Sequence, residues 1–140
     1  MEEFLHKEIT SKIIQAFYKV YNTLGYGFLE KVYENAMRIE ISKSGLHVEQ
    51  QKNIKVFYES EQVGDYYADL LVENLIIVEL KAAETICDEH ETQLLNYLKA
   101  TDIEVGLLIN FGKKAEIKRK IFLNKNKKLT SDPSYSTQSA

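Results

Sequence analysis

The chain has 140 residues, 44% of them hydrophobic, and a formal net charge of −3. This length predicts one domain with a single core, and no stretch approaches the roughly 20 apolar residues of a membrane span. The single cysteine, Cys87, excludes an internal disulfide and a multi-cysteine zinc site. The acidic start, Met1–Phe4, lacks the basic and apolar regions of a signal peptide. A reducing cytoplasm is therefore the expected location, with no membrane partner.

The charges are unevenly distributed along the chain. Residues 1–112 carry 10 Lys/Arg against 19 Asp/Glu, whereas residues 113–128 carry eight basic residues against one glutamate. A basic segment beside an acidic site could hold the phosphates of a polyanion, although a charge run is more commonly a solvated face. From residue 124 the composition turns polar. We therefore expect a domain over residues 1–123 and a disordered tail over residues 124–140.

Two helices are expected at the start of the chain. In residues 5–24, apolar side chains recur at spacings of three and four. The glycine turn at 25–27 interrupts this pattern, and residues 28–44 again place apolar side chains near one face. Gly45 suits the position after the second helix. Because the connection is short, we expect the two helices to pack as a pair.

Three extended segments follow the helices. Residues 46–58 alternate apolar and polar side chains, residues 59–61 form a turn, and residues 62–71 and 75–81 are again extended. Consecutive strands with such short connections favour an antiparallel meander.

The chain then returns to a helix and ends in two strands. Residues 88–100 form the third helix, with Asp88 as its N-cap and Glu91 three residues on. The apolar run 105–111 is typical of a central strand covered on both faces, and because it follows a helix we expect it to lie parallel to the preceding strand. Residues 117–123 are expected to form an edge strand guarded by lysines. The predicted order is ααβββαββ, an α/β sandwich around a mixed sheet.

The stretch from Asp69 to Lys81 carries the clearest chemical signal. Glu79 and Lys81 are two residues apart on a strand, so their side chains point to the same face, and Asp69 can reach that face if Asn74 turns a hairpin. Buried charges are costly unless they are paired or bind a cation, and Mg²⁺ prefers carboxylate oxygens. The pattern favours a metal-dependent phosphodiesterase site. The alternative is a structural ion pair of Glu79 with Lys81, with Asp69 as a turn residue.

Two further clusters accompany this stretch. Gly27, Glu30 and Tyr33 form a Gly-x-x-Glu-x-x-Tyr pattern at the start of the second helix. Gln93 and Tyr97 lie four residues apart and share one face of the third helix, at the rim of the same site. Taken alone, Glu30 is more often an acid favoured by the helix dipole, and Tyr33 is expected in the core.

With these clusters in order, the chain resembles the GxxExxY family of small bacterial and related proteins, a branch of the PD-(D/E)XK nuclease-like superfamily. The resemblance runs from about Ile9 to Phe122. Members often have Glu-Val-His before Leu-Gly, and a proline between the two glycines, where this chain has Lys19–Tyr21 and Tyr26. These exchanges weigh against an additional role for the first helix. The matching residues are Leu24–Gly25, Gly27–Tyr33, Asp69–Val72, Ile76–Ala82, His90–Glu91, Gln93–Leu95, Tyr97–Leu98 and Gly106–Phe111.

The resemblance implies a restriction-endonuclease-like fold with a nuclease site. Asp69 and Glu79 would ligate Mg²⁺ or Mn²⁺, and Glu30 matches the carboxylate that members often add from the first helical region. Lys81 would orient or help deprotonate the attacking water, or stabilise the charge of the transition state. A phosphodiester is anionic, so attack by hydroxide needs a cation to neutralise charge and activate water.

The resemblance also implies the substrate. Gln93 and Tyr97 match the Gln-x-x-x-Tyr element of the recombination-exonuclease branch, where it contacts DNA near the cut. The expected function is a divalent-metal-dependent nuclease acting on DNA. The alternative is a non-catalytic nuclease-like module that binds nucleic acid or a protein partner. Dimerisation, through the strand at 105–111 or the helical pair, stays open.

Overall fold

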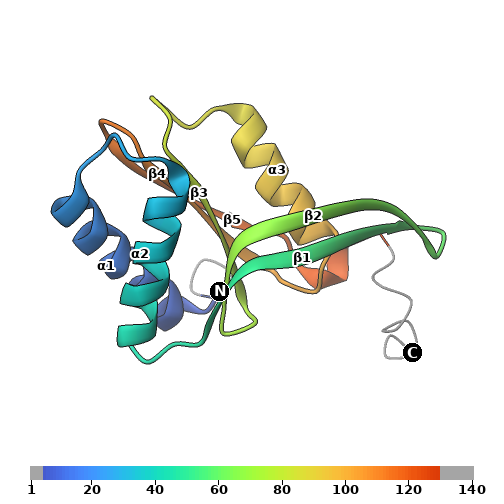
Figure 1. Ribbon diagram of the computed structural model, residues 1–140. Helices are drawn as coiled ribbons and strands as arrows, with labels where there is room; N and C mark the ends of the chain where they lie inside the picture. Colours follow the sequence, from blue (N-terminus) through green and yellow to red (C-terminus); the bar gives the residue numbers. More distant parts are fainter. Residues whose placement is uncertain (1–4, 130–140) are drawn as a thin grey trace.

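A computed structural model describes residues 5–129 of the chain (Figure 1). The elements follow the predicted order ααβββαββ and end with a short 3₁₀ turn, η2. Their bounds are α1 Lys7–Leu24, α2 Glu30–Lys43, β1 Val48–Tyr58, β2 Glu61–Val72, β3 Ile76–Lys81, α3 Asp88–Lys99, β4 Val105–Phe111, β5 Ala115–Ile121 and η2 Asn124–Asn126.

The five strands form one mixed sheet in the order β1-β2-β3-β4-β5. β3 and β4 are parallel, and the other neighbouring strands are antiparallel, which confirms the predicted meander and the predicted direction of β4. Glu73 and Asn74, between β2 and β3, both have positive φ, 54° and 55°. Two left-handed residues in succession are the geometry of the tightest hairpin turns, so Asn74 does turn the hairpin.

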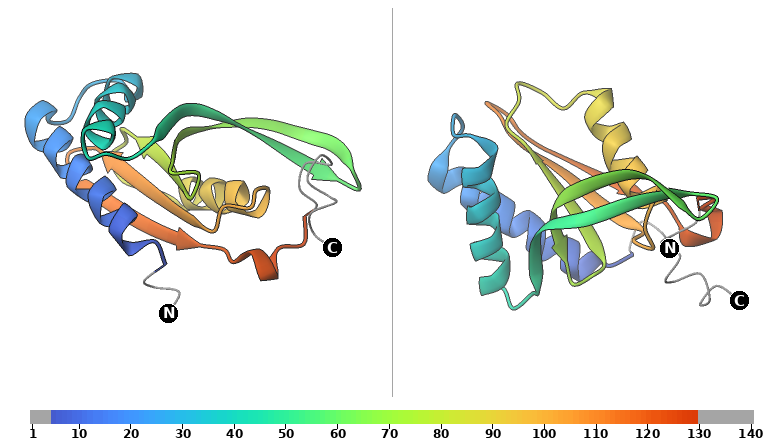
Figure 2. Two further views of the ribbon diagram at one scale, coloured as in Figure 1. Left: turned by 90° about the horizontal axis from the view of Figure 1, so that it is seen from below. Right: turned by 45° about the vertical axis from the view of Figure 1, so that its right-hand side comes forward.

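The helices cover both faces of the sheet (Figure 2). The helical pair α1–α2 packs on one face, where the rings of Phe17 and Tyr33 contact Phe111 with centroids 4.8 and 4.2 Å away. On the other face, Leu94 and Leu98 of α3 pack in a second apolar cluster. All seven residues of β4 are buried, because this strand lies between the two clusters.

Tyr33 fixes the glycine turn between α1 and α2. Its hydroxyl donates a hydrogen bond to the carbonyl oxygen of Gly25 at 2.6 Å and accepts one from the backbone N–H of Phe28 at 3.2 Å. Gly27, between them, has φ 114°, a conformation that side-chain-bearing residues rarely adopt. The spacing of glycine and tyrosine therefore places α2 relative to α1, and Tyr33 is fully buried, as predicted.

The sheet divides at β2. This strand pairs with β1 along nearly its whole length but with β3 only over residues 70–72. The paired segments 52–58 and 61–68, here called the hairpin arm, therefore extend beyond the rest of the sheet (Figures 1 and 2). The point where β2 leaves β3, at residues 69 and 79, is here called the fork.

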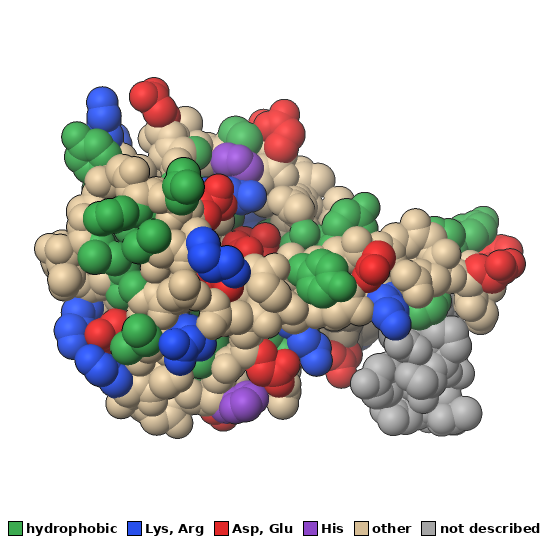
Figure 3. All heavy atoms as spheres, viewed as in Figure 1, with side chains coloured by type: hydrophobic (Ala, Val, Ile, Leu, Met, Phe, Trp, Pro, Cys, Tyr) green, Lys and Arg blue, Asp and Glu red, His purple; other side chains and the backbone are tan. Residues whose placement is uncertain are grey.

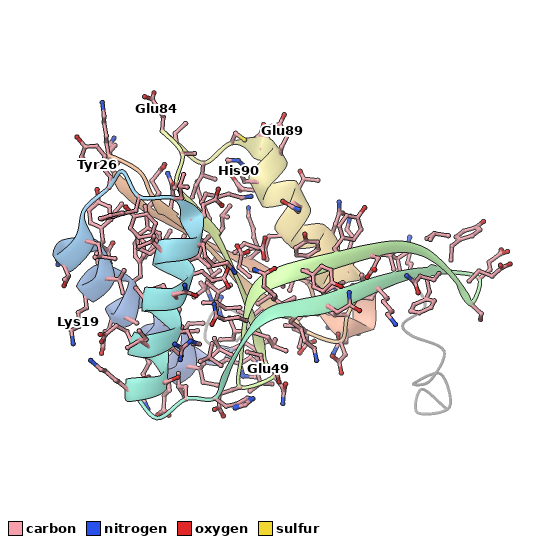
Figure 4. The ribbon with its side chains drawn as sticks, viewed as in Figure 1. Lys19, Tyr26, Glu49, Glu84, Glu89 and His90 are labelled. Carbon is pink, nitrogen blue, oxygen red and sulfur yellow. The ribbon has the colours of Figure 1, made fainter. Side chains whose placement is uncertain are left out.

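Two predicted boundaries need correction. The N-cap of α3 is Cys87 and not Asp88, because His90 at the start of the helix (Figure 4) accepts the backbone N–H of Cys87 on Nδ1 at 3.2 Å. β5 begins at Ala115, two residues earlier than predicted, because the turn after Phe111 is short enough for Ala115 to pair with it.

The last described residues pack on the domain. Within the segment assigned to the polar tail, Lys127 donates to the carbonyl oxygens of Thr101 and Ile103 at 2.7 and 2.6 Å. Residues 130–140 lie outside the described part of the chain. No helix within residues 5–129 is long and apolar enough to cross a membrane.

Candidate active site

Asp69 and Glu79 face each other at the fork. Leu70 and Val78 form the last pair of β2 and β3. Asp69 comes directly before Leu70, and Glu79 comes directly after Val78. In place of the sheet's backbone hydrogen bonds, the N–H of Asp69 donates to Glu79 Oε2 at 2.8 Å, and the N–H of Leu80 donates to Asp69 Oδ2 at 2.8 Å. The two carboxylates thus hold the strands together where backbone pairing stops.

Burial makes it costly for both carboxylates to be charged. Glu79 is only 5% exposed, and this burial, with the charge of Asp69 as the second cause, raises its pKa to about 8. The pKa of Asp69 is also raised, first by burial and then by the charge of Glu34. A cation between such groups would offset their repulsion.

The donor set fits a hard divalent cation. Mg²⁺ is typically bound by one or two carboxylates, with water and substrate oxygens completing its shell, and Asp69 and Glu79 supply such a pair. Within residues 5–129, no three His, Cys, Asp or Glu side chains are gathered to hold a metal by themselves. Acidic side chains do collect in the hollow between the helical pair and α3 (Figure 3).

Lys81 lies on the same side of β3 as Glu79, at the last position of the strand. Its positive charge opposes the rise in the pKa of both Asp69 and Glu79, although burial outweighs it. It forms no ion pair with any residue of the described part of the chain. The alternative of a structural Glu79–Lys81 pair therefore does not describe this site.

The second helix contributes a carboxylate that the sequence analysis missed. Glu30, the predicted one, is exposed at the first position of α2 and acts on Glu79 by raising its pKa through charge. Glu34, one turn further along, is only 4% exposed. The signal for it was present, because position 34 lies three residues before Met37 and seven before Ile41, on the buried side of the helix.

Glu34 is held by amides from β1 and by Lys31 of its own helix, whose Nζ lies 3.1 Å from Glu34 Oε2. Gln50 Nε2 donates to its Oε2 at 2.6 Å, and Gln51 Nε2 donates to its Oε1 at 2.8 Å. Gln51 Nε2 also lies 3.4 Å from Asp69 Oδ1, so one amide joins Glu34 to the pair at the fork.

Both glutamine amides can reach Glu34 because the backbone has an unusual conformation at Gln51. Successive residues of a strand point to opposite faces, but Gln51 has φ 54°, which turns the chain so that both amides reach Glu34. A non-glycine residue with positive φ inside a strand is uncommon and is often found at functional sites. Nothing in the sequence indicates this conformation.

The third helix, α3, contributes Gln93 and Tyr97 to the candidate site. Gln93 Nε2 donates to Tyr97 Oη at 2.8 Å, so the two residues share one face of α3, as predicted. Burial, followed by the charge of Glu79, raises the pKa of Tyr97 to about 12. The phenol therefore stays protonated near the carboxylate pair.

Part of the basic segment 113–128 serves the fold. Lys120 pairs with Glu91 of α3 at 2.5 Å, and Lys127 binds the two carbonyl oxygens of the α3–β4 connection. These two ammonium groups are engaged within the protein, whereas Lys113, Lys114, Lys118, Lys125 and Lys128 are exposed, as on a solvated face.

Comparison with known proteins places the chain in a family. No curated protein and no solved structure matches it. The family model described as the PD-(D/E)XK nuclease superfamily matches residues 7–120, from the start of α1 to the penultimate residue of β5. The mixed five-stranded sheet flanked by helices is the restriction-endonuclease-like fold predicted for it. The chain belongs to the PD-(D/E)XK nuclease superfamily.

Proposed function

We propose that this protein is a divalent-metal-dependent nuclease of the GxxExxY branch that hydrolyses phosphodiester bonds of DNA. The observation that carries the proposal is the pair of half-buried Asp69 and buried Glu79 beside Lys81, an ammonium group without an ion-pair partner among the described residues. A purely structural cluster would be expected to neutralise its own charges.

Asp69 and Glu79 would hold Mg²⁺ or Mn²⁺. When bound, such a cation neutralises phosphate charge and makes a water molecule a stronger nucleophile. The reciprocal bonds of the two carboxylates to the backbone of Asp69 and Leu80 fix their orientation before any ligand arrives. This preorganisation reduces the reorganisation that charge development in the reaction would otherwise require.

Lys81 would act at the reacting phosphate. Its ammonium group can donate hydrogen bonds to the attacking water or to a phosphoryl oxygen as negative charge develops there.

Glu34 is the α2 carboxylate that best accompanies the pair. It is buried, and Gln51 joins it to Asp69, whereas Glu30 is exposed on the preceding turn. Glu34 would therefore accept hydrogen bonds from water near the cation, and Glu30 would add negative charge at the mouth of the site.

The substrate would approach past α3. Tyr97 is protonated at neutral pH because its pKa is raised, so its hydroxyl can donate to a phosphate oxygen, with Gln93 holding it in place. These are neutral donors, which suits a site whose own carboxylates already repel a polyanion.

The proposal also includes a location of the protein in the cytoplasm.

A cleavage assay tests this function. Wild type, Lys81→Met and Lys12→Met are each incubated with single- and double-stranded DNA in Mg²⁺, Mn²⁺ or EDTA. We expect metal-dependent cleavage by wild type, a loss of roughly 100-fold or more in Lys81→Met, and no change in Lys12→Met. Lys12 is an exposed lysine of α1 that loses the same charge away from the fork.

Two outcomes would contradict the proposal. Cleavage by Lys81→Met at the wild-type rate would show that another site is responsible. Binding of DNA by wild type without cleavage in either metal would favour the non-catalytic module.

A further inference from the structure

A groove lies between α3 and the hairpin arm. Two of its lining residues, Gln93 and Tyr97, are the α3 residues of the candidate site, and the charges of Glu79 and Asp69 act on the pKa of Tyr97. The groove is lined by Val56 and Tyr66 of the arm, by Asp88, Glu89, Thr92, Gln93, Asn96 and Tyr97 of α3, and by Leu129.

Aromatic and aliphatic groups form one side of this groove. The ring of Tyr66 lies 5.8 Å from that of Tyr97, tilted by 47°, and Val56 stands next to it in the lining. Tyr66 is 47% exposed, although it packs against a buried tyrosine. Its ring therefore offers a flat apolar surface to a ligand.

Polar groups of α3 form the other side. Thr92 and Asn96 are exposed and four residues apart, so they stand one above the other on the helix. Within residues 5–129 neither side chain makes a hydrogen bond. An unpaired amide and an unpaired hydroxyl opposite an open ring can bind the edge of a heteroaromatic ring stacked on Tyr66.

Charge decides which part of a nucleotide fits here. Among residues 5–129, no lysine or arginine lines the groove, and Asp88 and Glu89 lie at its end nearest the start of α3 (Figure 4 labels Glu89). A phosphate in this groove would be repelled, whereas a neutral base, whose amino groups donate hydrogen bonds, would not.

We propose that this groove is a nucleobase subsite, which accepts the unpaired base of a nucleotide whose neighbouring phosphate lies at the Asp69–Glu79 pair. The inference rests on the proposed nuclease function and adds the substrate class. A base in an intact duplex is stacked and paired, so it cannot present its face to Tyr66 and its edge to Asn96 together. The substrate is a single strand or a frayed end, and base stacking on aromatic side chains supports binding of this kind.

The test measures binding separately from cleavage. Fluorescence anisotropy is followed with a short single-stranded oligonucleotide, the same strand carrying one abasic position moved along its length, and a blunt duplex. Ca²⁺ replaces Mg²⁺, and a gel confirms that the strands stay intact. The proteins are wild type, Tyr66→Ala, Tyr66→Phe and the matched control Tyr67→Ala. Tyr67 is the next residue of β2; it is 54% exposed against 47% for Tyr66, and it lies on the opposite face.

We expect wild type to prefer the single strand. One abasic position should weaken its binding roughly five- to 100-fold, and this penalty should disappear in Tyr66→Ala but persist in Tyr66→Phe and Tyr67→Ala. Equal thermal stability of Tyr66→Ala and Tyr67→Ala would exclude a folding defect. If the loss of affinity caused by the abasic position disappears only in Tyr66→Ala, the missing base is the group that Tyr66 binds.

The result can overturn the subsite without overturning the nuclease. If wild type cleaves DNA but binds duplex and single strand equally, or if Tyr66→Ala keeps the abasic penalty, the subsite is wrong and the proposed function stands. If wild type neither binds nor cleaves any of these strands, the proposed function fails, and the subsite fails with it.

Discussion

At the scale of single residues, the chemistry of the fork depends on how α2 supplies negative charge. Glu30 and Glu34 lie one turn apart on the same helix, yet one is exposed and the other buried among glutamine amides. The charge of Glu34 is offset within the protein by the ammonium group of Lys31, 3.1 Å from its Oε2, and by the two amides. The two residues therefore provide a matched pair for testing which carboxylate acts on a cation.

We predict that Glu34→Gln weakens Mn²⁺ binding more than Glu30→Gln does. Glutamine keeps the shape of Glu34 but removes the charge that Gln51 joins to Asp69. Titration of Mn²⁺ followed by electron paramagnetic resonance should show about a tenfold or greater loss of affinity for Glu34→Gln. Glu30→Gln should change it only by the small amount expected of an exposed charge. The opposite order would return the role to Glu30.

The sequence predicted this site in part. The convergence of Asp69, Glu79 and Lys81 could be predicted, because strand alternation and a hairpin turn at Asn74 are local properties of the sequence. The position of the Gln51 amide could not be predicted, because glutamine has no intrinsic preference for the positive φ that this residue adopts in the fold.

At the scale of the elements, α3 must lie close to the sheet for Tyr97 to reach the fork. Gly106 of β4 permits this approach, because a Cβ added there would lie 2.6 Å from Leu94 Cδ1. The packing of the Leu94 side chain against Gly106 therefore sets the distance of α3 from the sheet.

We predict that Gly106→Ala destabilises the protein by roughly 1–3 kcal/mol through overpacking. Leu94→Ala should cost roughly 2–5 kcal/mol through a cavity. The double variant should lose less than the sum, since the added methyl group enters the space that Leu94 vacates. Urea unfolding of the four proteins measures these free energies, and strict additivity would show that Gly106 does not set the position of α3.

The elements themselves were largely predictable, but how far β2 stays paired with β3 was not. The apolar run 105–111 indicated a central strand and was correct to the residue, because burial on both faces leaves a continuous signal. The hairpin arm was not foreseen, since how far β2 stays with β3 depends on packing that no single strand encodes. The groove beside the arm was therefore also beyond sequence reasoning.

At the scale of the whole molecule, the carboxylate pair links stability to pH and metal. In the folded protein the pKa of Glu79 is raised from 4.5 to about 8, so between these values the folded state binds a proton that the unfolded state has released. The contribution of this carboxyl to stability then falls as the pH rises from about 4.5 to about 8. A cation that binds the ionised pair would restore stability at the upper end of this window.

The most direct test of the cation site is thermal unfolding of wild type and Glu79→Gln across pH 5 to 8.5, with EDTA or with Mg²⁺. We predict that wild type in EDTA loses stability toward pH 8, and that Mg²⁺ at 100 times its dissociation constant restores about 2.7 kcal/mol there. Glu79→Gln should show neither the loss associated with this carboxyl nor the recovery. Identical profiles of the two proteins, with no response of wild type to Mg²⁺, would contradict a cation site at the fork.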